Sequence, residues 1–124
     1  MAKHKINLTP AILDLTLYSG DGAQFRFTVR NTGGDFVDLA GSMRAQIRTT
    51  RDAEDPLVEF DIDMSDAAEG VVLISLTGEK STLLTPTEEK FTGVWDLEWT
   101  PTGKEPITIL QGQVECDPDV TRGD

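Results

Sequence analysis

The chain has very little cysteine and histidine, with one residue of each among its 124 residues, Cys116 and His4. A single cysteine cannot form an internal disulfide, so the folded chain depends on its core for stability. A zinc site built from these residue types needs about four ligands, and a Cys–His nucleophile needs a held geometry between two residues that here lie near opposite ends. We expect no cofactor and no cysteine chemistry, with His4 solvated and Cys116 a small residue at a strand end.

Long apolar runs and phosphate-binding loops are also missing. No stretch approaches the roughly 18 residues of a membrane span, and the opening MAKHKINLTP has no apolar segment of a secretory signal. The glycines at 20–22 and 33–34 lack the spacing and the following helix of a nucleotide-binding loop. The sequence therefore predicts no membrane association and no phosphate cradle.

Positive charge is scarce as well, with 11 Lys and Arg against 22 Asp and Glu, and a net charge of −11. Binding of nucleic acid or of an anionic membrane depends on basic side chains. Arg44, Arg48 and Arg51 lie close together, but acidic residues follow at 52, 54 and 55. We expect no nucleic-acid partner, and the acidity fits a soluble protein or one that docks on a basic partner.

Short apolar–polar alternation dominates what is present, and turn residues interrupt it repeatedly. Phe25 and Phe27 alternate with polar neighbours in the clearest example. The absence of βαβ spacing argues against a parallel α/β sheet, and short, irregularly spaced strands favour a sandwich over a barrel. A bulge is expected near Gly112. The pattern predicts an all-β fold, an antiparallel sandwich of seven to eight strands, with strands near 13–17, 25–29, 43–47, 58–62, 72–76, 94–99 and 107–114.

Two short helical turns are expected between these strands. Residues 65–70 begin with capping residues and end at a glycine, and residues 77–85 stop at Pro86. We expect Leu83 and Leu84 of the second turn to face the core.

Acidic residues suggest two functional alternatives. Residues 61–66 resemble the opening of a calcium loop, but Asp66 and Val72 occupy the positions where the loop needs Gly and Glu. Asp96 and Glu98 share one strand face about 7 Å apart, a separation that suits a hydrolase carboxylate pair. Their neighbours are solvated strand positions, so an exposed face is the favoured interpretation.

Two binding motifs have simple structural alternatives. Trp95 and Trp99 could form a sugar platform, but both share the face of Leu97, which indicates core packing. The final tripeptide 122–124 reads Arg-Gly-Asp and resembles the integrin-recognition motif, although three-residue matches are frequent by chance. The sequence assembles no reacting site, which favours a domain that works by presenting surfaces.

Several short motifs occur together in a fixed order: LYSGDG at 17–22, FVDLAG at 36–41, RAQIR at 44–48, DAAEGVV at 66–72, GVWDLE at 93–98 and QGQV at 111–114. In order and spacing they resemble the immunoglobulin-like β-sandwich domain of minor structural proteins in long-tailed phages of actinobacteria, over about residues 12–116. The resemblance implies no catalytic residues. It implies a multi-copy virion component of the tail, baseplate or head surface, made in the host cytoplasm and contacting other phage structural proteins.

Placement on the tail or baseplate is the first expectation. Decoration of the capsid surface, a free-standing adhesion or carbohydrate-binding module using Trp99, and a hydrolase using acidic residues stay open as alternatives. We divide the chain into an N-terminal arm at 1–11, the sandwich at 12–116 and a flexible tail at 117–124. In the arm, Lys3 and Lys5 accompany the alternating Ile6 and Leu8, which predicts a partner-binding strand, with a frayed terminus as the alternative.

Overall fold

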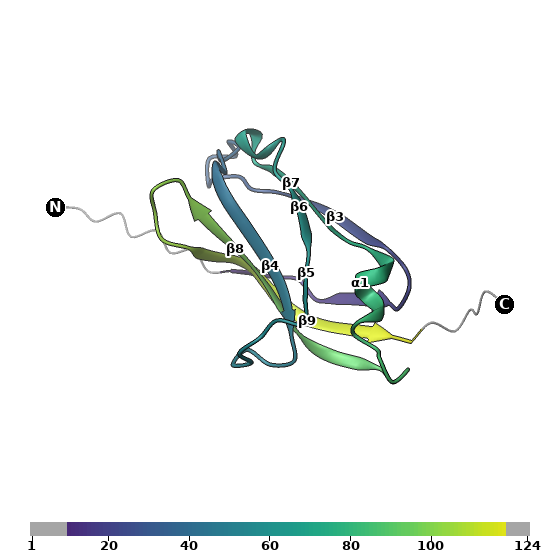
Figure 1. Cartoon of the computed structure of the whole chain (residues 1–124). Helices are drawn as coiled ribbons and strands as arrows, with labels where there is room; N and C mark the ends of the chain where they lie inside the picture. The colour runs from purple at the N-terminus through teal and green to yellow at the C-terminus, as the bar shows by residue number, and fades with distance from the viewer. Residues whose placement is uncertain (1–9, 119–124) are drawn as a thin grey trace.

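Two β-sheets face each other in the computed structural model, which describes residues 10–118 (Figure 1). The larger sheet has the order β1-β9-β8-β4-β5, with β2 also paired to β9, and the smaller sheet has the order β3-β7-β6. The strands are β1 (Ala11–Ile12), β2 (Leu15–Tyr18), β3 (Ala23–Thr28), β4 (Gly41–Arg48), β5 (Val58–Glu59), β6 (Asp61–Asp63), β7 (Val71–Leu76), β8 (Phe91–Pro101) and β9 (Ile107–Asp117).

This topology is that of an immunoglobulin-like sandwich. In that fold the second, fifth and fourth strands share one sheet, while the third, sixth and seventh share the other. To compare the two, β1 and β2 are counted together as the first strand, and β5 is an extra strand after the third. The second, fifth and fourth strands are then β3, β7 and β6, and the third, sixth and seventh are β4, β8 and β9. The predicted all-β sandwich is confirmed.

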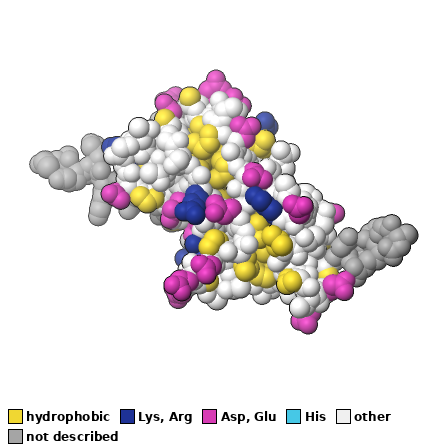
Figure 2. All heavy atoms as spheres, viewed as in Figure 1, with side chains coloured by type: hydrophobic (Ala, Val, Ile, Leu, Met, Phe, Trp, Pro, Cys, Tyr) yellow, Lys and Arg dark blue, Asp and Glu magenta, His cyan; other side chains and the backbone are white. Residues whose placement is uncertain are grey.

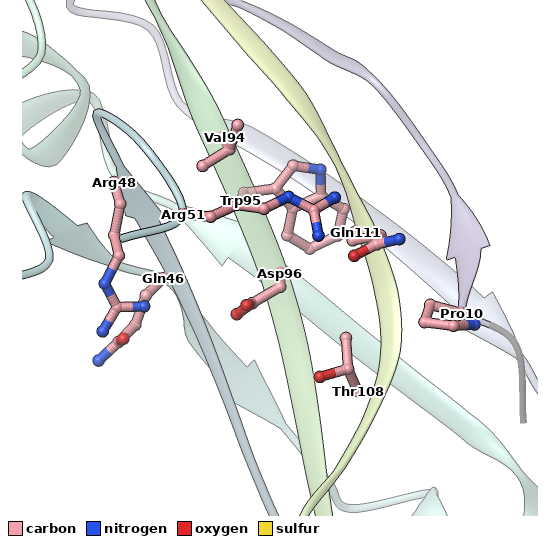
Figure 3. A pocket seen from close by; sticks show the side chains of 9 residues that line it. All are labelled: Pro10, Gln46, Arg48, Arg51, Val94, Trp95, Asp96, Thr108 and Gln111. Atoms are coloured by element: carbon pink, nitrogen blue, oxygen red, sulfur yellow. The ribbon is translucent and has the colours of Figure 1, made fainter. Parts of the chain in front are cut away.

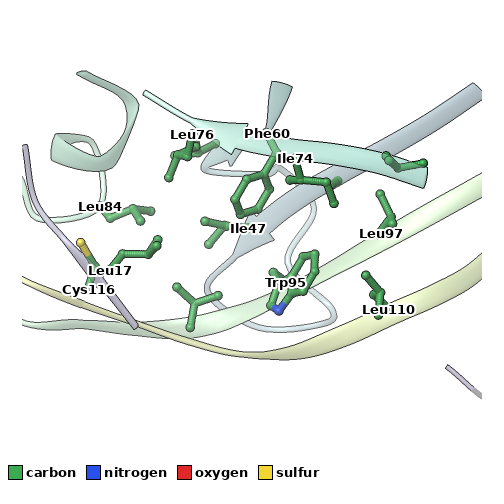
Figure 4. Packing of buried hydrophobic residues seen from close by; sticks show 14 of the residues in the cluster. Leu17, Ile47, Phe60, Ile74, Leu76, Leu84, Trp95, Leu97, Leu110 and Cys116 are labelled. Carbon is green, nitrogen blue, oxygen red and sulfur yellow. The ribbon is translucent and has the colours of Figure 1, made fainter. Parts of the chain in front are cut away.

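Alternate residues of both sheets fill the space between them. Trp95 is 2 % exposed and meets the rings of Phe25 and Phe60 edge-on, with centroids 5.8 and 5.7 Å away. Ile47 and Leu97 lie in the same apolar layer (Figure 4). The inward positions predicted from the alternation are therefore the core, and Trp95 is a core residue as expected.

Nine strands replace the seven segments expected, because one segment is split and one strand, β1, precedes the first expected segment. The segment at 58–62 changes sheets at Phe60, between β5 on β4 and β6 on β7. The segment expected at 13–17 is a strand only from Leu15, because Leu13 and Asp14 form a break between β1 and β2. There the Leu13 carbonyl accepts the Trp95 indole N–H at 2.7 Å. An Asp14 carboxylate oxygen accepts a hydrogen bond from the backbone N–H of Gln113 at 2.9 Å. The break therefore satisfies polar groups of two other strands.

The sandwich is antiparallel as predicted except in one part of the larger sheet, where two strand pairs are parallel. Both β1 and β2 run parallel to β9. The chain then crosses to the smaller sheet through the turn before β3, so β2 and β3 are neighbours in sequence but belong to different sheets. The expected bulge is also displaced, because the register of β8 and β9 shifts at Leu97 and Glu98 and leaves Ile109 as the extra residue rather than Gly112.

The two helical turns form where the sequence places them. The first is the 3₁₀ turn η1 (Ala67–Glu69), which ends at Gly70 with a φ of 80°, a value that favours glycine. The second is α1 (Gly78–Thr82), where the Thr77 hydroxyl accepts the Lys80 amide. Leu84 is buried as predicted, but the prediction for Leu83 is wrong, since it is 59 % exposed. Successive residues in a helical turn point about 100° apart, so one faces solvent when its neighbour faces the core.

Candidate docking surfaces

The smaller sheet has an open edge along β3. Antiparallel strands point the backbone groups of alternate residues at their partner and those of the intervening residues away. The Val29 amide donates to the Gly70 carbonyl at 2.9 Å, and the register pairs Phe27 with Val72 and Phe25 with Ile74. The outward-pointing amides and carbonyls are therefore those of Gln24, Arg26 and Thr28, and within residues 10–118 no strand other than β7 pairs with β3.

The other sheet edges are protected by features that discourage pairing. The β5 edge is two residues long. The β6 edge has three residues, of which Asp61 and Asp63 are charged, and charges on an edge oppose the addition of another strand. The six residues of β3 include one charged residue, Arg26. The edge formed by β1 and β2 is interrupted at Leu13 and Asp14. The six residues of β3 are the longest uninterrupted edge in the described part of the chain.

A polar groove lies on the outer face of the larger sheet, on the side away from the core (Figure 3). Strand alternation produces it, because residues next to the inward Ile47 and Trp95 in sequence must point outward. The groove has a volume of about 330 Å³, and the first described residue, Pro10, lies at its side. Its polar lining consists of Gln46, Arg48, Arg51, Asp96, Thr108 and Gln111.

The two arginines of this groove have no ion-pair partner among the described residues. No carboxylate among residues 10–118 lies within 4 Å of either guanidinium. The Nε of Arg48 is buried and has no hydrogen-bond acceptor. Three other basic side chains do have an acidic partner: Arg44 pairs with Glu59 at 3.4 Å, Lys80 with Asp61, and Lys90 with Glu115.

The paired charges have the electrostatics expected of surface ion pairs. The Arg44 guanidinium donates to Glu59 and lowers the pKa of that carboxyl, while Glu115 raises the pKa of Lys90. Near the centre of the face in Figure 2, basic side chains lie beside acidic ones. Such exposed pairs are screened by water and contribute little to stability. Within residues 10–118, Arg26, Arg30 and Lys104 lack an ion pair as the groove arginines do, so what distinguishes Arg48 is its buried Nε without an acceptor.

The acidic residues considered for catalysis lie on β8, and those considered for calcium lie on or just after β6 in the other sheet. Asp96 lines the groove, and Glu98 is on the same outer strand face, as predicted. Asp61 pairs with Lys80, and Asp63 accepts the Ser65 amide at 2.9 Å. Among residues 10–118, no group of three or more His, Cys, Asp or Glu side chains could hold a metal ion.

The remaining candidates have structural roles. Trp99 is partly buried, and its indole N–H donates to the Ala40 carbonyl at 3.1 Å. Cys116 is fully buried at the end of β9, and this burial, with the neighbouring Asp117, raises the pKa of the thiol. A protonated, buried thiol is a poor nucleophile.

Some predicted site residues lie outside the described residues. These are the arm residues Lys3, Lys5, Ile6 and Leu8, together with His4 and the Arg-Gly-Asp tripeptide at 122–124. Sequence reasoning missed the groove. The signal in the sequence is the closeness of Arg44, Arg48 and Arg51, but the acidic residues after them suggest neutralisation when the sequence is considered alone. In the structure, only Arg44 of these three has an acidic partner.

No helix within residues 10–118 is long and apolar enough to span a membrane. A comparison with models of known protein families finds no match, and a comparison with curated protein sequences finds none either. The phage resemblance described above therefore stays a prediction that depends on the order and spacing of its motifs.

Proposed function

We propose that this chain is a non-enzymatic structural component of a phage virion, located on the tail or baseplate, that acts through contacts with other phage structural proteins. The phage assignment depends on the order and spacing of the sequence motifs. The observation that carries the docking role is the open edge of β3, with the outward backbone groups of Gln24, Arg26 and Thr28.

An open edge of this kind binds a partner by adding its strand to the sheet. Main-chain hydrogen bonds supply affinity, and alternate side chains supply specificity. Three residues offer three amides and three carbonyls, and each bond contributes about 0.5–1.5 kcal/mol before the cost of ordering the partner. One such contact is weak, but many copies in a symmetric assembly add their contacts together.

The predicted arm suits the donor side of this contact. Ile6 and Leu8 alternate as a strand requires, and Lys3 and Lys5 give the arm positive charge in a chain whose net charge is −11. In this proposal, one chain accepts a strand at β3 and also supplies its arm to a neighbour. A multi-copy assembly of head-to-tail contacts follows from that arrangement.

The test uses purified virions that encode the chain. The change Arg26→Pro removes one outward amide while leaving every hydrogen bond to β7 in place, because proline is tolerated on an edge strand when its nitrogen faces solvent. The matched control, Arg26→Ala, removes the side chain and keeps the amide. We expect mass spectrometry to find the wild type and the alanine variant in virions, and the proline variant strongly depleted.

Immunogold labelling of the same virions tests the location. Label over the tail or baseplate supports the proposed location. Label over the head would instead assign the chain to the capsid surface. Absence of the wild-type chain from virions overturns the proposed virion role. Equal incorporation of the proline and alanine variants overturns docking by strand addition at β3. Circular dichroism of each purified variant confirms that it is folded.

A further inference from the structure

We infer that the arm of a second copy of this chain adds to β3 with Ile6 and Leu8 packed into an apolar seam between the two sheets. The seam is the side of the core between the edge strands β2 and β3, where Leu15, Phe25 and Phe27 lie. This inference rests on the strand addition proposed above and deepens it, because it names the side chains of the donor strand, their register and the surface that receives them.

Apolar side chains along the seam are less covered than those one strand further in. Phe25 and Phe27 are half-buried, whereas the residues opposite them on β7 are completely buried. On the other sheet, Leu15 is half-buried and its partner on β9, Val114, is completely buried. A strand added to β3 continues the inner face of the sheet, so its alternate side chains cover these three residues and remove more apolar area from water.

The opposite side of the sandwich is closed by the chain itself. There the backbone crosses between the sheets at Phe60, which is 6 % exposed and whose ring lies in the core beside Trp95 (Figure 4). On the β3 side the chain crosses only at the turn of residues 19–22. Leu17, next to that turn, is 6 % exposed, but Leu15 is half-buried. Within the described part of the chain, no strand therefore covers the seam beyond the turn.

The apolar residues of the arm have the spacing that the seam requires. Ile6 and Leu8 are separated by one residue, as are Phe25 and Phe27, so both pairs lie on one face of a strand. In antiparallel pairing, the more stable kind, Leu8 can lie opposite Phe25 while Ile6 lies opposite Phe27. Each phenyl ring at the edge then has an aliphatic neighbour from the arm.

Charge on the outer face selects this register over its neighbours. With Leu8 opposite Phe25, the residue of the arm beside Arg26 is the neutral Asn7. A shift of two residues in one direction places Lys5 beside Arg26, and like charges directly opposite are destabilising. A shift in the other direction moves both apolar side chains of the arm past Phe25. Only the first register fills the seam without placing two positive charges side by side.

The geometry of the chain assigns the arm to a second copy. The turn after β2 reverses the chain, and β3 runs back along the other sheet (Figure 1). Counting in both directions from this turn puts Phe25 level with Thr16, about five strand positions, or about 17 Å, from Ala11. Leu8 precedes Ala11 by three residues, a span of at most about 11 Å. Leu8 therefore cannot lie opposite Phe25 of its own chain.

The test is nuclear magnetic resonance of the dilute, isotope-labelled full chain with an unlabelled peptide. The probe is the blocked peptide Ala-Lys-His-Lys-Ile-Asn-Leu-Thr-Pro, which has the sequence of residues 2–10. We expect the outward amide signal of Arg26 to move and to saturate at peptide concentrations up to about 5 mM, the range of a weak single contact. Intermolecular Overhauser contacts should join Leu8 to the ring of Phe25 and Ile6 to the ring of Phe27.

A control peptide separates the seam from backbone pairing alone. It carries Ile6→Ser and Leu8→Ser, which keep the charge and the main-chain hydrogen bonds but remove the apolar side chains, so we expect it to bind about tenfold more weakly or less. Because this control leaves the protein unchanged, it does not depend on the folding of a variant. In the protein, Leu15→Ala removes one wall of the seam and should weaken binding of the native peptide. Leu57→Ala, an exposed apolar position on the β5 side, should bind like the wild type.

The inference is overturned if the native peptide does not saturate the Arg26 signal, or if the serine peptide binds as tightly as the native one. Contacts that pair Leu8 with a ring other than that of Phe25 overturn the register. Contacts between the arm and Phe25 in the dilute chain without peptide overturn the assignment to a second copy, because the chain's own arm would then cover the seam.

These outcomes are distinguishable from failure of the proposed function. If the two peptides bind equally while Arg26→Pro is still depleted from virions, docking at β3 stands and the seam does not take part. If the native peptide binds as expected while the proline and alanine variants enter virions equally, the seam stands and its role in virion assembly does not.

Discussion

The two faces of the larger sheet use the same strands in opposite ways. On the inner face, Ile47, Trp95 and Leu97 are buried almost completely, and the one polar group of Trp95 is satisfied by the Leu13 carbonyl. On the outer face, immediate neighbours in sequence such as Arg48 and Asp96 line a polar groove, where the Arg48 Nε has no acceptor. The inner face closes its polar contacts within the chain, while on the outer face one buried donor has no acceptor among the described residues.

This difference indicates that adjacent residues of one strand have different roles. Stability comes from positions that face the other sheet, because burial of apolar area is the main favourable term in folding. Positions one residue away are free to carry binding. Substitutions on the inner face should therefore change the free energy of unfolding strongly, and substitutions on the outer face should leave it almost unchanged.

The largest expected effect comes from Trp95→Ala. This change empties the aromatic cluster with Phe25 and Phe60 and leaves the Leu13 carbonyl without its donor. We expect a loss of about 3–5 kcal/mol in the free energy of unfolding, measured by urea denaturation. Trp99→Ala on the same strand is the control, with a smaller loss because Trp99 is only partly buried; equal losses would contradict the account of the inner face.

A smaller but still clear effect is expected from Gly112→Ala. A Cβ atom at this position would lie 2.0 Å from the Leu13 carbonyl oxygen, so the backbone of the break between β1 and β2 must move. Overpacking of this kind costs about 1–3 kcal/mol. The control is Gly22→Ala, where the nearest atom is the Leu76 oxygen at 3.7 Å and thermal unfolding should be almost unchanged. If Gly112→Ala is as stable as wild type, the close approach is wrong.

The outer face is tested by Arg48→Met. Methionine retains an unbranched stem and removes the buried Nε that lacks an acceptor. Eliminating an unsatisfied donor is neutral or stabilising, so we expect the free energy of unfolding to stay the same or to rise by up to about 1 kcal/mol. A loss comparable to that of Trp95→Ala would show that the outer face also carries the fold.

The smallest effect is expected at the exposed turn after β6 and appears only at low pH. The Ser65 hydroxyl and amide donate to Asp63 and lower the pKa of its carboxyl from the ordinary 3.8. A carboxyl with a lowered folded-state pKa stabilises the fold above its unfolded-state pKa, and this stabilisation disappears as pH falls through the folded-state value. Wild type and Asp63→Asn should therefore differ by a constant amount above about pH 5 and converge below about pH 4. A difference that grows on acidification would contradict this sign.

Much of the fold could be predicted from local alternation, because each strand carries its own period of two. The core position of Trp95 followed from the same pattern. The break at Leu13 and Asp14 could not be predicted, since its causes, the Trp95 indole and the Gln113 amide, are about 80 or more residues away in sequence. The parallel pairing of β1 and β2 with β9 depends on the same distant contacts.

The candidate surfaces were less accessible to sequence reasoning. That a sandwich has open edges was expected, but identifying β3 as the exposed one required the strand order. The groove required the loop after β4 to bring Arg51 beside Arg48, while the acidic residues that follow in sequence stay out of ion-pair range of both. Leu83 was misplaced because the sequence did not reveal which side of a short helical turn faces the core.

Amide hydrogen exchange along β3, resolved residue by residue by nuclear magnetic resonance, tests the open edge most directly. The account predicts alternation: slow exchange at Phe25 and Phe27, whose amides face β7, and fast exchange at Gln24, Arg26 and Thr28, whose amides face outward. Uniform protection of all five amides, or the opposite alternation, would contradict the register and remove the basis for strand addition at this edge.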